Sequence, residues 1–345
     1  MKKRETELDI LRLLAMLAVI WVHVGGIETG SLPASDPNCQ WLIFLKSVMT
    51  WEIPVYVMIS GRFFLDPDRE MPFSRILKAI RRLVLAFVVW NVVYQIWYIA
   101  RDTYTGLNWK GIMSQALIGP YHFWYLYMIV GLYLITPFLR KIAEDKGLAE
   151  YFIGLFFLFM LLTKYCVQLP FVGATLDSML GSMGMKFVLG YSGYYVLGYY
   201  LRKFPLSGKW ERLLYVCGAV LLLLGAAANT VCSAREGAYT ERFTGYTNPN
   251  TIIVAAAIYT LFTKRISKVQ ISEKATQLIS RLSEYSFGVY LIHALLLDVF
   301  AVAGLKPTVL HPVLAMPLIT MLTFAVTAVI VMLIRKVPYA GKRIT

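Results

Sequence analysis

The sequence predicts an all-α membrane protein, a polytopic helix bundle of about ten transmembrane helices, and three observations lead to that prediction. Hydrophobic residues make up 58% of the 345 residues and charged residues only 16%. A soluble domain is roughly 45–50% apolar and about 25% charged, so the chain departs from that class on both counts. The apolar residues also occur in blocks about as long as a bilayer crossing, and basic residues flank alternate ends of these blocks.

Ten apolar blocks are separated by charged segments or segments rich in Pro and Gly. They predict spans near residues 9–26, 42–64, 83–100, 122–139, 150–166, 183–201, 213–231, 249–263, 284–303 and 312–334. The first block has no small-residue cleavage site, so we expect a retained span and not a signal peptide. No long polar segment lies between the spans, which predicts a single membrane domain over residues 1–345.

The distribution of Lys and Arg predicts the orientation of these spans. If the N-terminus is inside, the inner segments are 1–8, 65–82, 140–149, 202–212, 264–283 and 335–345, and they hold 24 of the 34 basic residues. Six lie in or beside outer loops, and Arg12, Lys46, Arg62 and Lys186 fall within spans. Since positive charge marks the cytoplasmic side, we expect both termini in the cytoplasm.

The net charge of +14 does not indicate nucleic-acid binding, because the basic residues are spread over every inner loop. The four cysteines have no CxxC or Cys/His spacing, so no metal site is expected. Cys39, Cys166 and Cys232 lie near outer loops, where either a disulfide or free thiols are compatible with the sequence.

Two ionisable residues, Arg12 and His23, lie inside the first span and need a functional explanation. Eleven helical residues turn about 20° past three full turns and rise about 16 Å, so the two side chains share a face but do not pair. Arg12 lies near the inner end and His23 near the outer end. The alternative is structural, with Arg12 reaching lipid headgroups and His23 hydrogen-bonding a neighbouring helix.

Arg12 and His23 match the Arg-x10-His pattern of the acyltransferase-3 family of bacterial membrane O-acyltransferases, and three further segments resemble that family in the same order. These segments are residues 54–61 (PVYVMISG), 122–137 (HFWYLY followed by GLYLITP) and 285–293 (YSFGVYLIH). The resemblance implies a multi-pass protein of the bacterial plasma membrane. It would transfer an acyl group, expected to be acetyl from acetyl-CoA or another acyl-CoA, to a hydroxyl of a cell-envelope carbohydrate.

The residues fit this reaction. A neutral imidazole can accept the proton of an attacking hydroxyl, so His23 is the expected general base. Arg12 is expected to take part in catalysis and to hold a donor phosphate or the pantetheine arm. Lys78, Arg81 and Arg82 share one helical face and could bind the phosphates of coenzyme A, as could Arg62. Basic residues at an inner helix end are also ordinary determinants of topology, and that alternative stays open.

Four further residues are expected to bind substrate. His293 lies mid-span with Tyr290 one turn before it, and His122 and Trp124 lie at the outer start of the fourth span. A helix–helix hydrogen bond for His293 and an interfacial aromatic belt for His122 and Trp124 are the structural alternatives. Asp298 could orient a histidine. As functions of the whole chain, a transporter or flippase of a small polar molecule or lipid-linked sugar, or a membrane anchor for a partner enzyme, remain alternatives to the enzyme.

Overall fold

The computed structural model describes residues 5–104, 108–185, 189–338 and 341–345, and every regular element within these ranges is a helix. Among the described residues, eight helical segments are long and apolar enough to cross a membrane. They are α1 (Thr6–Thr29), α2 (Pro37–Ser47) with α3 (Glu52–Phe64), α4 (Phe73–Ala100), η1 (Tyr121–Phe123) with α6 (Trp124–Glu144), α7 (Lys146–Lys164) with η2 (Cys166–Gln168), α11 (Gly208–Glu236), α13 (Glu273–Val302) and α14 (Pro312–Ile334). The predicted all-α bundle is confirmed.

The shorter helices account for the difference from the ten predicted spans. They are α5 (Trp109–Ile118), α8 (Gly173–Ser182), α10 (Ser192–Lys203), α12 (Pro249–Lys264), η3 (Ile266–Lys268) and α15 (Gly341–Ile344). The predicted spans 183–201 and 249–263 correspond to α10 and α12, whose 12 and 16 residues are only about 18 and 24 Å long. Both helices are largely buried, so protein and not lipid surrounds them. Residues 186–188 of the predicted sixth span lie outside the described residues.

The second predicted span is broken, because residues 48–51 separate α2 from α3. Asp36 caps the start of α2, accepting a hydrogen bond from Asn38 N at 2.8 Å. At the break, Trp21 Nε1 donates to Leu45 O and Trp51 Nε1 donates to Val48 O, at 2.8 and 3.1 Å. Indole groups thus satisfy carbonyls that the interrupted helix leaves free, which is the condition for a broken helix inside a membrane.

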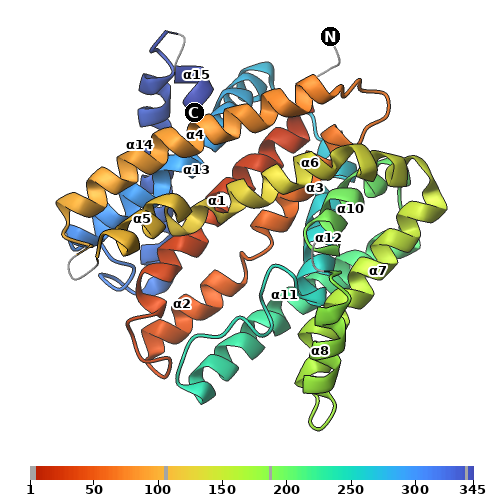
Figure 1. Ribbon diagram of the computed structural model, residues 1–345, viewed down its shortest axis with the longest axis horizontal. Helices are drawn as coiled ribbons and strands as arrows, with labels where there is room; N and C mark the ends of the chain where they lie inside the picture. The colour runs from red at the N-terminus through yellow and green to blue at the C-terminus, as the bar shows by residue number, and fades with distance from the viewer. Residues whose placement is uncertain (1–4, 105–107, 186–188, 339–340) are drawn as a thin grey trace.

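The helix ends that carry the basic residues meet at one end of the bundle. Arg62 at the end of α3 pairs with Glu5 before α1, and Arg202 at the end of α10 lies 3.2 Å from the Asp66 carboxylate. Arg140 near the end of α6 donates to the Asp66 carbonyl at 2.9 Å. Figure 1 shows both termini along the same edge of the molecule. The segments predicted to share one side of the membrane therefore do lie together, while the compartment on that side stays a prediction.

Helices α3 and α10 cross in direct backbone contact at two glycines. A Cβ atom built on Gly61 would lie 1.9 Å from the Tyr195 carbonyl oxygen, and one built on Gly198 would lie 2.1 Å from the Met58 carbonyl oxygen. Small residues allow this approach, which packs membrane helices without a hydrophobic driving force between them. The crossing holds α3 against the buried centre of the bundle.

Candidate functional site

The centre of the candidate site is a pair of hydrogen-bonded histidines from opposite ends of the chain, whose rings lie nearly in one plane. His23 lies near the end of α1 and His293 lies two-thirds of the way along α13. Their rings are 4.9 Å apart between centroids and nearly parallel, and His23 Nδ1 lies 2.6 Å from His293 Nε2. The two histidines that were predicted separately, as general base and substrate-binding residue, are therefore direct neighbours.

The hydrogen bonds of this pair fix the proton positions when both rings are neutral. His293 Nδ1 lies 2.7 Å from the Tyr290 carbonyl oxygen, which can only accept, so Nδ1 carries the proton. Nε2 of His293 is then an acceptor, and His23 Nδ1 must donate to it. The lone pair of His23 is consequently on Nε2, the nitrogen that His293 does not bind. An imidazole held in this tautomer presents a basic nitrogen to a substrate.

His122 and Tyr290 pack around the pair. The His122 ring lies 5.1 Å from His293 and 6.2 Å from His23 between centroids, and it is buried. The Tyr290 hydroxyl donates to the His122 carbonyl oxygen at 2.5 Å, which fixes η1 against α13. Neither ring nitrogen of His122 has a partner that meets hydrogen-bond geometry among the described residues, although the Leu291 backbone lies near the ring. Buried polar atoms of this kind are exceptional in a protein interior.

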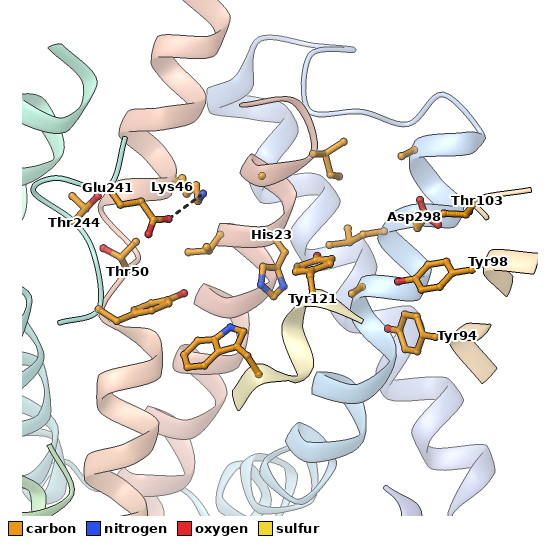
Figure 2. Close-up of a pocket in the computed structure, with 18 of the residues that line it drawn as sticks. His23, Lys46, Thr50, Tyr94, Tyr98, Thr103, Tyr121, Glu241, Thr244 and Asp298 are labelled. Carbon is orange, nitrogen blue, oxygen red and sulfur yellow. Dashed lines mark ion pairs between the residues drawn. The ribbon is translucent and has the colours of Figure 1, made fainter. Parts of the chain in front are cut away.

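A pocket of about 690 Å³ opens beside His23 at the end of the bundle away from the termini. Figure 2 shows His23 next to Tyr121 in the middle of the pocket, between Lys46 with Glu241 on one side and Asp298 on the other. The lining is rich in aromatic side chains, namely Tyr94, Tyr98, Tyr121, Trp124 and Tyr246. The pocket is large enough for a small organic substrate. Trp124, which is predicted to bind substrate, lines the pocket, whereas His122 does not line it and is buried.

Tyr246 belongs to the pocket wall and lies in the segment between α11 and α12. Burial raises the pKa of Tyr246 well above its ordinary value, and the neighbouring Glu52 carboxyl adds to that effect. The hydroxyl therefore keeps its proton and donates to Glu52 Oε1 at 2.6 Å. The Tyr246 carbonyl oxygen accepts from Tyr194 OH at 2.6 Å, so the loop is anchored to α10.

Arg12 lies on α1 toward the end of the bundle that holds the termini. Its Nη1 donates to Asp9 Oδ1 at 3.0 Å and to Ser283 Oγ at 3.1 Å, and its side chain is 28% exposed. Among the described residues, the two hydrogen bonds found for the Arg12 side chain both use Nη1. A guanidinium has five N–H donors, so Arg12 retains donors for an anionic ligand.

The remaining basic residues predicted to bind the donor do not form one cluster of free charges. Lys78 and Arg81 are exposed on α4. Arg82 donates to the Thr345 carbonyl oxygen at 2.8 Å and lies over the Phe287 ring. Arg62 is buried and pairs with Glu5. Lys78, Arg81 and Arg82 are thus the exposed members of the predicted set, and Arg82 also holds the C-terminal residue, whereas Arg62 is buried in an ion pair.

Several residues around the pocket were not predicted from the sequence. Lys46 lies within a predicted span, where an ionisable side chain is costly and therefore indicates a functional site. Glu241 and Tyr239 lie in an outer loop whose sequence gives no such signal. Asp298 does not orient a histidine; it pairs with Arg101 at 2.5 Å and accepts from Trp97 Nε1 at 2.5 Å. The four cysteines are free thiols.

Comparison with protein families agrees with this architecture. The acyltransferase domain family of membrane proteins matches residues 5–334, nearly the whole chain, including both histidines and Arg12. Neither the curated proteins nor the solved structures contain a match to the chain. The apolar helices and the family match together make the chain a multi-pass membrane protein and an acyltransferase in the general sense. The chain belongs to the acyltransferase-3 family.

Proposed function

We propose that the protein is an O-acetyltransferase of the bacterial plasma membrane that moves an acetyl group from cytoplasmic acetyl-CoA to a hydroxyl of a cell-envelope glycan. The observation that carries the proposal is the contact of His23 Nδ1 with His293, which leaves the lone pair on Nε2 of a histidine that lines a pocket of about 690 Å³. The pocket lies at the opposite end of α1 from Arg12, so donor and acceptor can approach His23 from different sides of the membrane. The family membership supports the acyl transfer in general.

The reaction uses His23 first as base and then as acid. Nε2 takes the proton of the acceptor hydroxyl as its oxygen attacks the thioester carbonyl carbon. The C–S bond then breaks, and the imidazolium returns the proton to the departing thiolate of coenzyme A. The ester oxygen comes from the acceptor, so no water, metal or redox partner is consumed.

Arg12, Lys78 and Arg81 provide the donor side of the site. Arg12 keeps free donors on α1, and Lys78 and Arg81 are exposed on α4, which is where an anionic diphosphate arriving from the cytoplasm would bind. Arg82 is also exposed on α4 and keeps donors beside its bond to Thr345, whereas Arg62 is buried and would contribute only if the donor displaced Glu5. This arrangement agrees with termini on the cytoplasmic side.

The proposal is tested with purified protein in lipid nanodiscs supplied with radiolabelled acetyl-CoA and envelope glycans. We expect release of the coenzyme A thiol together with transfer of the label to the glycan, and a gain of one acetyl group by mass spectrometry. A transporter or flippase would consume no acetyl-CoA. Absence of both thiol release and label transfer across a panel of envelope glycans would refute the proposal.

A substitution of His293 tests whether it positions His23. His293→Leu removes the acceptor for His23 Nδ1–H and frees the ring to adopt the other tautomer, so we expect kcat to fall about 100-fold, within the range for general acid–base contributions. The KM for acetyl-CoA should change less than twofold. His293→Gln supplies an amide oxygen near the same place and should recover at least part of kcat. Equal loss in both variants would indicate that His293 only fills space.

A further inference from the structure

Two charged triads of the same construction line the pocket beside His23. In the first, Lys46 Nζ lies 3.9 Å from Glu241 Oε1, and the Tyr239 hydroxyl donates to the same carboxylate at 3.0 Å. In the second, Arg101 Nη1 lies 2.5 Å from Asp298 Oδ1, and Trp97 Nε1 donates to the other carboxylate oxygen at 2.5 Å. We call them the Lys46 triad and the Arg101 triad.

The aromatic member of each triad also contacts the cation. Lys46 Nζ lies 4.0 Å from the centroid of the Tyr239 ring, and the Arg101 guanidinium lies 5.8 Å from that of Trp97. Both distances are within the range of cation–π attraction. Each ring therefore donates a hydrogen bond to its carboxylate and contacts its cation with its face. A carboxylate or cation that turned away would lose both its counterion and the ring.

The triads cancel charge locally on two sides of the pocket. Lys46, Arg101, Glu241 and Asp298 all line the pocket, two cations and two carboxylates among its described residues. Figure 2 shows Glu241 with Lys46 on one side of His23 and Asp298 on the other. Glu52 does not itself line the pocket; it accepts a hydrogen bond from the hydroxyl of Tyr246, which does. A negatively charged acceptor would meet a carboxylate beside each cation that could bind it.

An uncharged hydroxyl compound meets no such conflict. A hydroxyl can accept from the Lys46 ammonium and donate to the Glu241 carboxylate at once, because it is both donor and acceptor. The 3.9 Å separation of Lys46 Nζ and Glu241 Oε1 is longer than a direct hydrogen bond, so a hydroxyl oxygen can bridge the two groups. The Tyr and Trp rings of the lining offer flat apolar faces to the C–H groups of such a compound.

From this construction we infer that the two triads act as a charge filter, which admits an uncharged polyhydroxylated acceptor to His23 and excludes anionic ones such as uronic acids. The carboxylates Glu241 and Asp298 determine this specificity by neutralising the cations that would attract an anion. The inference rests on the proposed function for the reaction, but the preference itself is a property of binding and can be measured without turnover.

The test compares methyl glucoside with methyl glucuronide as acceptors and as ligands. In the wild-type protein the neutral compound should have at least a tenfold higher kcat/KM with acetyl-CoA. Glu241→Gln keeps a hydrogen-bond acceptor for Tyr239 but removes the charge beside Lys46. We therefore expect the kcat/KM for glucuronide, divided by that for glucoside, to rise about tenfold. Asp298→Asn should also raise this ratio, because it removes the charge beside Arg101. Lys46→Met should lower the ratio, because it removes a cation and leaves the Glu241 carboxylate.

Glu236→Gln is the matched control. Glu236 is at the end of α11, on the same outer segment as Glu241, and pairs with Arg242 at 3.0 Å, but it does not line the pocket. The same loss of charge there should leave the ratio unchanged. If Glu236→Gln shifts the ratio as much as Glu241→Gln, general electrostatic attraction explains the preference and the charge filter is refuted.

Equilibrium binding of the two radiolabelled compounds separates this inference from the proposed function. If no acetyl transfer occurs but the wild-type protein binds glucoside at least tenfold more tightly than glucuronide, the function fails and the filter stands. If transfer occurs with equal or better efficiency on glucuronide, the filter fails and the function stands. Binding of neither compound at millimolar concentration would also overturn the filter.

Discussion

Replacement of His23 by Gln should lower kcat/KM for acetyl transfer by 100- to 10,000-fold, the range attributed to a general base. The amide of Gln can still donate to His293 Nε2, so the contact between α1 and α13 is kept while the basic nitrogen is lost. We expect acetyl-CoA to bind with unchanged affinity, because the donor site is proposed to lie around Arg12. Calorimetric binding and thiol release measured on the same preparation separate these two effects.

The same substitution at His311 is the control for this experiment. His311 is exposed, caps the start of α14 and takes no part in the pocket. His311→Gln should therefore retain full activity. Turnover by His23→Gln within tenfold of the wild-type value would exclude His23 as the base and leave the His23–His293 pair as a structural contact between helices.

Replacement of Gly61 by Ala should destabilise the protein by about 3 kcal/mol or more, at the upper end of overpacking costs. The added methyl group would lie 1.9 Å from the Tyr195 carbonyl oxygen, and backbone atoms cannot rotate away as a side chain can. Helices α3 and α10 must move apart, and this movement disturbs the packing at the buried centre of the bundle. Thermal unfolding in detergent, followed by size-exclusion chromatography, should show a lower midpoint or loss of the monodisperse protein.

Gly131 in α6 provides the comparison, since it belongs to another family-like segment and is also helical. A Cβ built on Gly131 has no other heavy atom within 4 Å. Alanine is favoured over glycine in a helix by up to about 1 kcal/mol, so Gly131→Ala should leave the midpoint unchanged or raise it. Equal stability of the two variants would show that the α3–α10 crossing has room to adjust.

Much of the fold was predictable because the bilayer restricts it. Apolar length and the distribution of Lys and Arg correctly grouped the inner segments at one end, and α14 has the predicted bounds of 312–334. The predicted span 249–263 was already short and matches α12, whereas the sequence could not reveal that α10 begins only at Ser192, because a buried helix needs only protein around it. It also could not locate the break after Ser47, which depends on Trp21 and Trp51 satisfying free carbonyls.

The candidate site was predictable residue by residue but not as an arrangement. His23 and His293 each stood out as ionisable groups within a span, yet their 2.6 Å contact depends on how α1 crosses α13. The charged triads depend on a loop, where Glu241 and Tyr239 reach Lys46 only after the chain has folded. Periodicity and charge bias describe single helices, so contacts between helices and loops stay outside their reach.

The hydrogen-bonded histidines have a consequence for biosynthesis, because they come from positions 270 residues apart. At ribosomal rates of about 5–20 residues per second, the partner of His23 emerges roughly 15 to 50 s after it. Until α13 inserts, the imidazole of His23 lacks the ring that sets its tautomer. Under the proposed function, a nascent chain, or one truncated before α13, would therefore turn over the donor far more slowly than the complete chain, and full activity would follow only after α13 has entered the membrane.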